Sequence, residues 1–421
     1  MNADRRTADL YQWYASLAEA SFWVPVFFLY FASYMPLDAV LSLEALYFLS
    51  VVTIEVPSGW LADRIGRRPT MLAGAVLMAA SHLMLFSGPW LMAGDSMGSP
   101  LFIFFAIGQG LRAAGVAFRS GTDTALHHDA LFACGKVDEF AAREARASKR
   151  RFLGASAAAL IGGGVAAIDL RLPYACSFIV AVAMIVVIVR MREPSAGADA
   201  RTRSNILSQA GACFALWKSP ALLLLFVFAA MMLVLNHVPY EYFQPYIEAS
   251  LGQEGLAVAT TPLVTGLHVA VTFWIASLVS ARSIRIRNRV GLWGVLLIAM
   301  LLQVLTIGLM SLWLSPLIVI FLLLRSCPRA IMTPPLNAAV TGAVPTKLRA
   351  TYLSLQSFVG RLSFSGALFM LTFVVPAAAV TAWPTIRTQL ALAAIGSLGF
   401  LAFITVVTII RRRRDDQLGA A

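Results

Sequence analysis

The sequence carries little charge for its length. Only 13% of its 421 residues are Asp, Glu, Lys or Arg, about half the share of a typical soluble domain. Its four cysteines show neither metal-ligand nor redox spacing, so they predict neither a metal centre nor a disulfide framework. The sequence also lacks a nucleotide-binding loop, a nucleophile triad and a metal-ligating cluster. These absences argue against an enzyme, and we expect no catalytic residues, no cofactor and no metal.

The sequence is rich in apolar residues. They make up 59% of the chain, and runs of about 20 largely apolar residues, enough to cross a hydrocarbon core roughly 30 Å thick, recur almost throughout. We predict twelve crossings, at 15–36, 39–58, 70–93, 100–124, 152–169, 172–191, 220–247, 257–280, 290–311, 314–337, 350–374 and 386–410. The sequence therefore predicts an all-α integral membrane protein in a lipid bilayer. Residues 1–12 precede no clear cleavage site, so we expect a tail leading into an uncleaved helix.

Basic residues outnumber acidic ones, 33 to 21, and their positions predict the orientation. We place 26 of the 33 in the two tails and in the loops that follow even-numbered crossings. Because cytoplasmic loops are enriched in Lys and Arg, we predict that both termini are cytoplasmic, in a cell (inner) membrane. Positive charge spread over membrane-flanking loops suits anionic lipid headgroups, so we expect no nucleic-acid partner.

One polar stretch, 193–219, is long enough to connect two domains. It becomes apolar-periodic between Ile206 and Trp217, which predicts a short helix on the membrane surface. We therefore predict an N-terminal six-helix bundle over 1–192, a cytoplasmic linker over 193–219, and a C-terminal six-helix bundle with a basic tail over 220–421. We expect the protein to be a monomer.

The string that follows the second predicted crossing, GWLADRIGRR at 59–68, has a distinctive order of glycine, acid and base. It resembles the GxLADRxGRR cytoplasmic signature loop of the major facilitator superfamily, a class of membrane carriers that work by alternating access. Glu55, Pro57 and Ser58 resemble the E-x-P-[ST]-G pattern of one branch, made up mostly of exporters. The resemblance implies twelve crossings in two six-helix bundles and transport of a small molecule.

In that family the signature loop acts as a latch that holds the cytoplasmic side closed. Its acid meets the start of helix eleven, and its basic residues reach an acid at the cytoplasmic end of helix four. Carried over by position, the implied gate residues are Gly59, Asp63, Arg64, Gly66, Arg67, Arg68, Asp123, Arg349 and Thr351. The alternative is that these charges only hold a turn that sets the topology.

Two other strings depart from the family patterns. In SGTDTALHHDAL, at 120–131, His128 stands where one branch has tyrosine, and the His-His-Asp run suggests either a metal site or, as we expect, a solvated loop end. In helix five, Gly154 and 162–164 resemble part of a glycine-rich signature of drug antiporters but lack its glycine–proline pair. These glycines also fit close helix packing.

Charged side chains inside the predicted crossings mark a candidate substrate pathway, because an ionised group at mid-bilayer costs roughly 2.5–3.5 kcal/mol. Arg112, Arg325 and Arg361 lie nearest the middle, and Arg329 follows Arg325 at a helical i, i+4 spacing. A cluster of forked donors suits a carboxylate or phosphate. We therefore hypothesise a substrate with an anionic group; salt bridges to Glu241 or another acid are the alternative.

Helix seven is the most polar crossing. His237, Glu241 and Gln244 share one helical face, next to Tyr240. Two prolines in the same stretch predict a break or kink, which is tolerated beside a cavity or other protein. We interpret this stretch as a mobile outer gate with a titratable acid. The alternative is an interfacial aromatic belt with a satisfied carboxylate.

Without a nucleotide site, an ion gradient is the expected driving force, and a buried carboxylate is a natural element for proton coupling. Glu241 is the first candidate and Glu19 the second, with His237 beside Glu241 in helix seven. We predict proton-coupled export of a small amphiphilic organic molecule, a drug or metabolite. Proton-coupled uptake by a symporter is the alternative within this class. A non-transporting membrane sensor or scaffold is the alternative from another class.

Overall fold

The computed structural model describes residues 3–35, 37–91, 99–194, 206–253, 261–374 and 383–419, and all regular secondary structure in these ranges is helical. The first half holds α1 (Ala3–Ala18), α2 (Phe27–Ala32), α3 (Leu37–Ile65), α4 (Arg67–Leu91), α5 (Ser99–Arg119), α6 (Thr122–Ala133), α7 (Phe140–Ala166) and α8 (Leu172–Arg190). The second half holds α10 (Ile206–Ala215), α11 (Pro220–Gln253), α12 (Thr261–Leu312), α13 (Pro316–Phe321), α14 (Cys327–Ala343), α15 (Arg349–Val374) and α16 (Trp383–Gly419).

Several of these helices are long and apolar enough to cross a membrane. Among the described residues there are seven such helices, or eight if the bent pair 42–55 and 57–65 forms one span. The longest, Pro262–Leu312, covers two of the predicted crossings. The chain is thus a multi-pass, all-α membrane protein, and the total of twelve crossings in two bundles stays a prediction.

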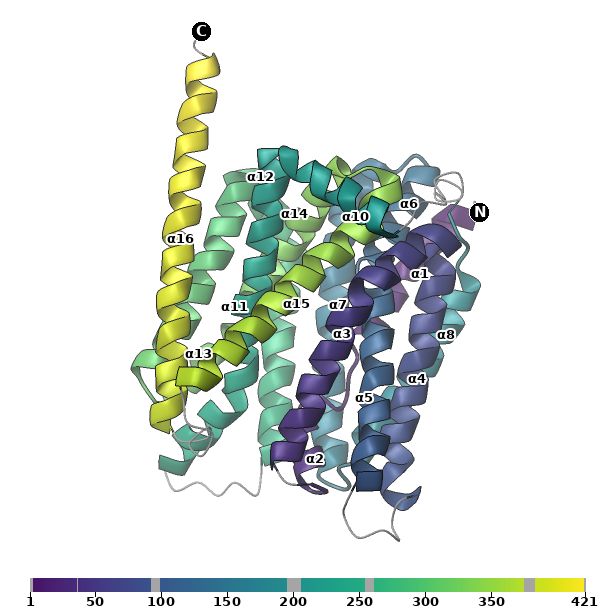
Figure 1. Ribbon diagram of the computed structural model, residues 1–421, viewed down its shortest axis with the longest axis vertical. Coiled ribbons are helices and arrows are strands. Elements are labelled where there is room, and N and C mark those ends of the chain that lie inside the picture. The colour runs from purple at the N-terminus through teal and green to yellow at the C-terminus, as the bar shows by residue number, and fades with distance from the viewer. Residues whose placement is uncertain are drawn as a thin grey trace.

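The two ends of the described chain lie at one face. α1 begins and α16 ends at the top of Figure 1, where α10 also lies. We call this face the predicted cytoplasmic face. α10 falls within the linker predicted to contain a surface helix, while residues 195–205 of that linker lie outside the described residues.

The first predicted crossing is not one helix. α1 already begins at Ala3, inside the predicted tail, and ends at Ala18; turns follow to Val26, where α2 is about to begin. The freed backbone groups bind other helices: Arg119 donates to the Ala18 carbonyl, and the Phe22 amide donates to Ser177 Oγ at 3.2 Å. Such partners are what makes a break tolerable at membrane depth.

Two predicted loops are also shorter than expected. The signature string does not form a loop, because α3 continues to Ile65 and only Gly66 separates it from α4. In the second half, the helix runs through the predicted loop at 281–289 and bends at Gly291, whose φ of 77° and ψ of 172° are not helical. In both places a single glycine with positive φ makes the turn that the sequence predicts over about ten residues.

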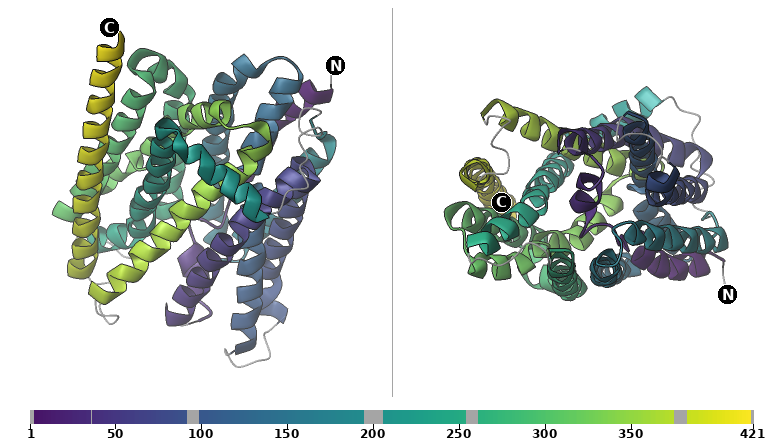
Figure 2. Two further views of the ribbon diagram at one scale, coloured as in Figure 1. Left: turned by 45° about the horizontal axis from the view of Figure 1, so that its top comes forward. Right: turned by 90° about the horizontal axis from the view of Figure 1, so that it is seen from below.

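Each half has a large core of its own, and smaller apolar clusters join the two halves, such as Phe152 with Ala276 and Ala330. The largest cluster of buried apolar side chains draws its members from 213–404, including Phe228 and Ile404. The next draws its members from 11–191, including Tyr11 and Met184. Between the halves, α3 lies against α15, and α7 lies against α12 and α14. The left view of Figure 2 shows α3 and α15 side by side.

Candidate functional site: a latch above a charged centre

The turn between α3 and α4 depends on the conformation of Gly66 and on the Glu193 carboxylate. The Gly66 φ of 112° lies in the region that favours glycine. The Glu193 carboxylate accepts hydrogen bonds from the backbone N–H groups of Arg67 and Arg68, each at 2.8 Å. A carboxylate at this position satisfies two free donors of α4 and interacts favourably with the helix dipole. Gly59 is buried within α3.

The acid of the signature string reaches the second half of the chain. Asp63 Oδ2 accepts from the Thr351 hydroxyl at 2.6 Å and from the Thr351 backbone N–H at 3.2 Å, at the start of α15. The Arg67 guanidinium lies 3.7 Å from the other carboxylate oxygen. The Asp63 side chain is only 2% exposed. The structure therefore brings together the two segments that the family resemblance pairs.

Asp129, rather than Asp123, is the helix-four acid at this latch. Asp129 is fully buried and pairs with Arg67 of the first half and, at 3.1 Å, with Arg349 of the second. Asp123 instead pairs with Arg151 of α7 at 2.8 Å, so its predicted partners were wrong. The physical reason is that the chain turns at Gly121 and continues as α6, which carries Asp129 further along the helix to the latch.

Two of the basic residues stay within the first half. Arg64 is exposed, with its guanidinium 5.1 Å from the Trp60 ring centre. Arg68 donates to the carbonyls of Ile188 and Val189 at the end of α8. Of the three arginines, only Arg67 crosses to the second half, donating to the Thr346 carbonyl at 2.9 Å.

The double histidine is buried, so the predicted solvated loop end was wrong. His128 Nδ1 accepts from Arg349 at 2.9 Å, and His127 Nδ1 lies 3.1 Å from Glu144. Burial raises the pKa of the Glu144 carboxyl, but His127 and Arg151 lower it more, so that it lies below its ordinary value. Among the described residues, no group of three His, Cys, Asp or Glu side chains is placed to hold a metal ion.

Contacts between α3 and α15 continue towards mid-membrane. Glu55 is fully buried and lies 3.5 Å from Arg361. Deeper still, the Phe48 and Phe364 rings are 5.8 Å apart, and His237 of α11 packs 4.8 Å from the Phe364 ring. Arg361 thus follows the salt-bridge alternative rather than serving as a free donor.

The three C-terminal arginines do not form the predicted cluster. Arg325 contacts α12, where it donates to His268 and Thr272. Arg329 is exposed, and its guanidinium lies 6.0 Å from the Phe152 ring centre. The predicted i, i+4 spacing requires a continuous helix from Arg325 to Arg329, but residues 325 and 326 form a turn and α14 begins only at Cys327. The arginines therefore point to different neighbours.

A second cluster surrounds Arg112 of α5. Its Nε donates to Gln109 at 2.7 Å, and its guanidinium lies 3.9 Å from the Tyr47 ring centre and 4.3 Å from that of Trp23. Cation–π contacts of this kind are strongest when they are shielded from water. Glu44 lies close enough to Arg112 to interact with it electrostatically.

The predicted coupling acids lie in different surroundings. Glu241 interacts electrostatically with Glu44, and its Oε1 is buried without a hydrogen-bond partner among the described residues. Glu19 is ion-paired, 3.3 Å from Arg119, in the break after α1. His237 Nδ1 bonds to the Leu233 carbonyl at 2.7 Å. α11 runs unbroken through its prolines, so the predicted break is absent; the Gln244 side chain lies outside the described residues.

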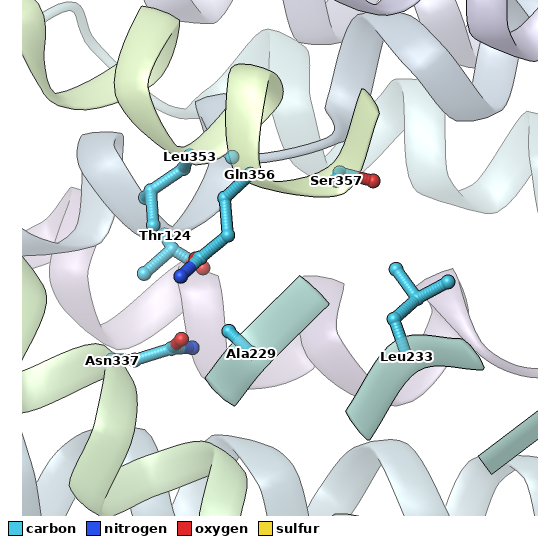
Figure 3. Close-up of a pocket in the computed structure, with 8 residues that line it drawn as sticks. Thr124, Ala229, Leu233, Asn337, Leu353, Gln356 and Ser357 are labelled. Atoms are coloured by element: carbon cyan, nitrogen blue, oxygen red, sulfur yellow. The ribbon is translucent and has the colours of Figure 1, made fainter. Parts of the chain in front are cut away.

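A small cavity lies between the halves, lined from both of them. Its volume is about 200 Å³, and its lining includes Thr124, Leu233, Asn337, Gln356 and Ser357. In Figure 3 the Gln356, Thr124 and Asn337 side chains face one another. Typical ligand pockets measure about 300–1,000 Å³, so this space suits water or a small fragment of a ligand.

Together, the fold and the site define a helical membrane protein whose halves are joined by a buried polar latch. No family model and no curated protein matches the chain. Solved structures do match. The human organic anion transporter MFSD10 (TETRAN) is 16% identical, with a TM-score of 0.64 over 94% of this chain and 99% of that one.

Two further structures give the same result. The nucleoside transporter NupG is 14% identical, with a TM-score of 0.61 over 96% of this chain and 99% of that one. The proton:xylose symporter XylE, of the major facilitator superfamily, is 13% identical, with a TM-score of 0.64 over 95% and 96%. The chain therefore has the major facilitator superfamily fold, as its signature string predicts.

Proposed function

We propose that the protein is a secondary active transporter that moves a small organic molecule across the membrane by alternating access. The observation that carries this proposal is Asp129, which is fully buried between Arg67 of one half and Arg349 of the other. A buried ion pair is a poor source of net stability but strongly favours one arrangement over another. It therefore suits a contact that forms when one face closes and breaks when that face opens.

We propose protons as the coupling ion, with Glu241 and Glu44 as the titrating pair. Two carboxylates that interact in a buried site are not readily ionised together, so one of them tends to hold a proton. Glu44 also interacts electrostatically with Arg112, which links the pair to the first half of the chain. Glu19 is the weaker candidate, because Arg119 already neutralises it.

We propose that the protein exports its substrate, and that this substrate is an amphiphilic drug or metabolite. Support comes from the E-x-P-[ST]-G string at 55–59, which resembles a branch made up mostly of exporters. Uptake is the second candidate, because the structurally similar XylE is a proton symporter. In either case we propose that the protein acts as a monomer in the cell (inner) membrane, with both termini cytoplasmic.

Counterflow in vesicles of known orientation tests this function. The purified protein is reconstituted with a mixed panel of neutral, cationic and anionic solutes on one side, and exchange of labelled solute is followed. We expect saturable exchange of at least one solute class, followed by accumulation when a pH gradient is imposed. Absence of exchange for every class, with intact protein, would favour the sensor or scaffold alternative.

A further inference from the structure

Arg325 is a buried cation surrounded by neutral groups. The residue is 6% exposed, and its Nη1 donates to Thr272 Oγ1 at 2.7 Å and to His268 Nδ1 at 3.0 Å. His268 Nε2 bonds to the Val319 carbonyl at 3.0 Å, which only an N–H can do. Nδ1 is then the acceptor, and the imidazole is neutral. These partners orient the guanidinium without cancelling its charge.

The described residues offer Arg325 no ion-pair partner. Its guanidinium instead lies 4.2 Å from the Phe243 ring centre. By contrast, Arg361 and Arg119 have glutamate partners at 3.5 Å and 3.3 Å. A buried charge is costly unless it is paired and hydrogen-bonded. Among the described residues, Arg325 lacks the acidic partner that Arg361 and Arg119 have, so its charge is available to an acid from outside the chain.

Arg112 of the first half is also buried without a salt bridge to any described residue, but it differs from Arg325 because Glu44 lies close enough to interact with it electrostatically. Arg112 is 5% exposed, bonds to a neutral Gln109 and has no carboxylate within ion-pair distance among the described residues. Tyr240 of α11 is 40% exposed, and its ring centre lies 6.4 Å from that of Phe243, the ring that contacts Arg325.

We propose that Arg325 binds the anionic group of an organic substrate, a carboxylate or a sulfonate. The planar guanidinium fork matches the paired oxygens of either group. The ring of Phe243 lies against the Arg325 guanidinium and offers an apolar surface to the rest of the substrate. The inference rests on the proposed transport function only in placing this site on the substrate pathway.

Equilibrium binding to the detergent-purified full chain tests the site without requiring transport. The probes are 2-naphthoate, 2-naphthalenesulfonate, the matched methanol and the matched methylamine. We expect both anions to bind at least about tenfold more tightly than the alcohol and the amine. The Arg325→Gln variant should weaken anion binding about 10- to 100-fold, the range for a lost charged hydrogen bond, with little change for the alcohol.

Three further variants keep the test decisive. Arg325→Lys retains the charge without the fork and should bind anions with intermediate affinity. Thr272→Val removes a group that orients Arg325 and should weaken anion binding several-fold, even if Arg325→Gln does not fold. Arg171→Gln is the matched control, because Arg171 is paired with Asp169 outside this site; its anion affinity should match the wild type.

The results separate the binding site from the transport function. Equal affinity for anion and alcohol, a preference for the amine, or wild-type anion affinity in a folded Arg325→Gln protein would overturn the site. Selective anion binding without exchange in any vesicle assay would support the site and contradict the transporter. Exchange of solutes without a preference for anions would support the transporter and contradict the anion site.

Discussion

Replacing Asp129 with Asn should open the predicted cytoplasmic face. Asp129 is fully buried and pairs with one arginine from each half, so the substitution leaves Arg67 and Arg349 facing each other without the acid. Removing one partner of a buried ion pair costs about 3–5 kcal/mol. Even the lower figure changes the ratio of closed to open molecules roughly a hundredfold.

A native cysteine can report this change. Cys213 of α10 is fully buried, and burial raises the pKa of its thiol to about 12, which makes it unreactive. α10 packs against α3 of the first half and α15 of the second, so opening the latch should uncover it. In a background where the other three cysteines are replaced by serine, we expect Asp129→Asn to raise the alkylation rate of Cys213 by one to two orders of magnitude.

The control is the same Asp→Asn substitution at an ion pair that does not join the halves. Asp169→Asn breaks the 2.5 Å pair with Arg171, between α7 and α8, and should leave Cys213 as protected as in the wild type. A folded Asp129→Asn protein whose Cys213 reacts at the wild-type rate would refute the argument that Asp129 holds the halves together.

Three further predictions concern packing, backbone and pH. Gly162→Ala would place Cβ 2.1 Å from the Phe22 carbonyl oxygen and should cost about 1–3 kcal/mol. Gly164→Ala, with nothing within 4 Å and a position inside α7, should unfold at the wild-type temperature or slightly above it. Gly66→Ala should cost about 1–2 kcal/mol, because φ at this turn is 112°; an unchanged melting temperature would show that the turn is unstrained. Because the Glu144 carboxyl has a lowered pKa in the folded protein, its contribution to stability is present above the ordinary pKa of 4.5 and is lost as pH falls below it. As the pH is lowered below 4.5, melting temperatures should therefore fall less steeply for Glu144→Gln than for the wild type, and parallel curves would contradict this.

Parts of the latch could be predicted from the sequence because they depend on residue types at fixed local spacing. The Gly66 turn and the acid at Asp63 both lie in one ten-residue string. Asp129 could not be assigned in this way. Asp123 lies at the end of the fourth predicted crossing and Asp129 just after it, and the choice between them depends on the direction that α6 takes after Gly121. The string at 120–131 contains both acids, but only tertiary packing shows which of them reaches the latch.

The deep arginines show a second limit. Helical spacing places Arg325 and Arg329 on one face only if the helix is regular, but Arg325 lies in the turn at 325–326, just before α14 begins. The break after α1 also cannot be predicted from local pattern. It depends on Arg119 reaching the Ala18 carbonyl and on Gly162 approaching Phe22, contacts between residues about a hundred positions apart. Local pattern alone cannot predict such contacts.

Glu44 of α3 has no distinguishing local pattern in the sequence. Its significance comes from Glu241, almost two hundred residues later in the chain, with which it interacts electrostatically. The fold was therefore more predictable than the site. Apolar length indicates a membrane helix from a single segment, whereas a charged site requires that several helices be placed relative to one another.

The central claim is that this chain couples proton movement to solute movement. The most direct test compares pH-driven accumulation with counterflow in proteoliposomes, for the wild type and for the Glu44→Gln/Glu241→Gln double variant. We predict that the wild type performs both, and that the double variant keeps counterflow but loses accumulation driven by the pH gradient. Undiminished pH-driven accumulation by the double variant would contradict the account.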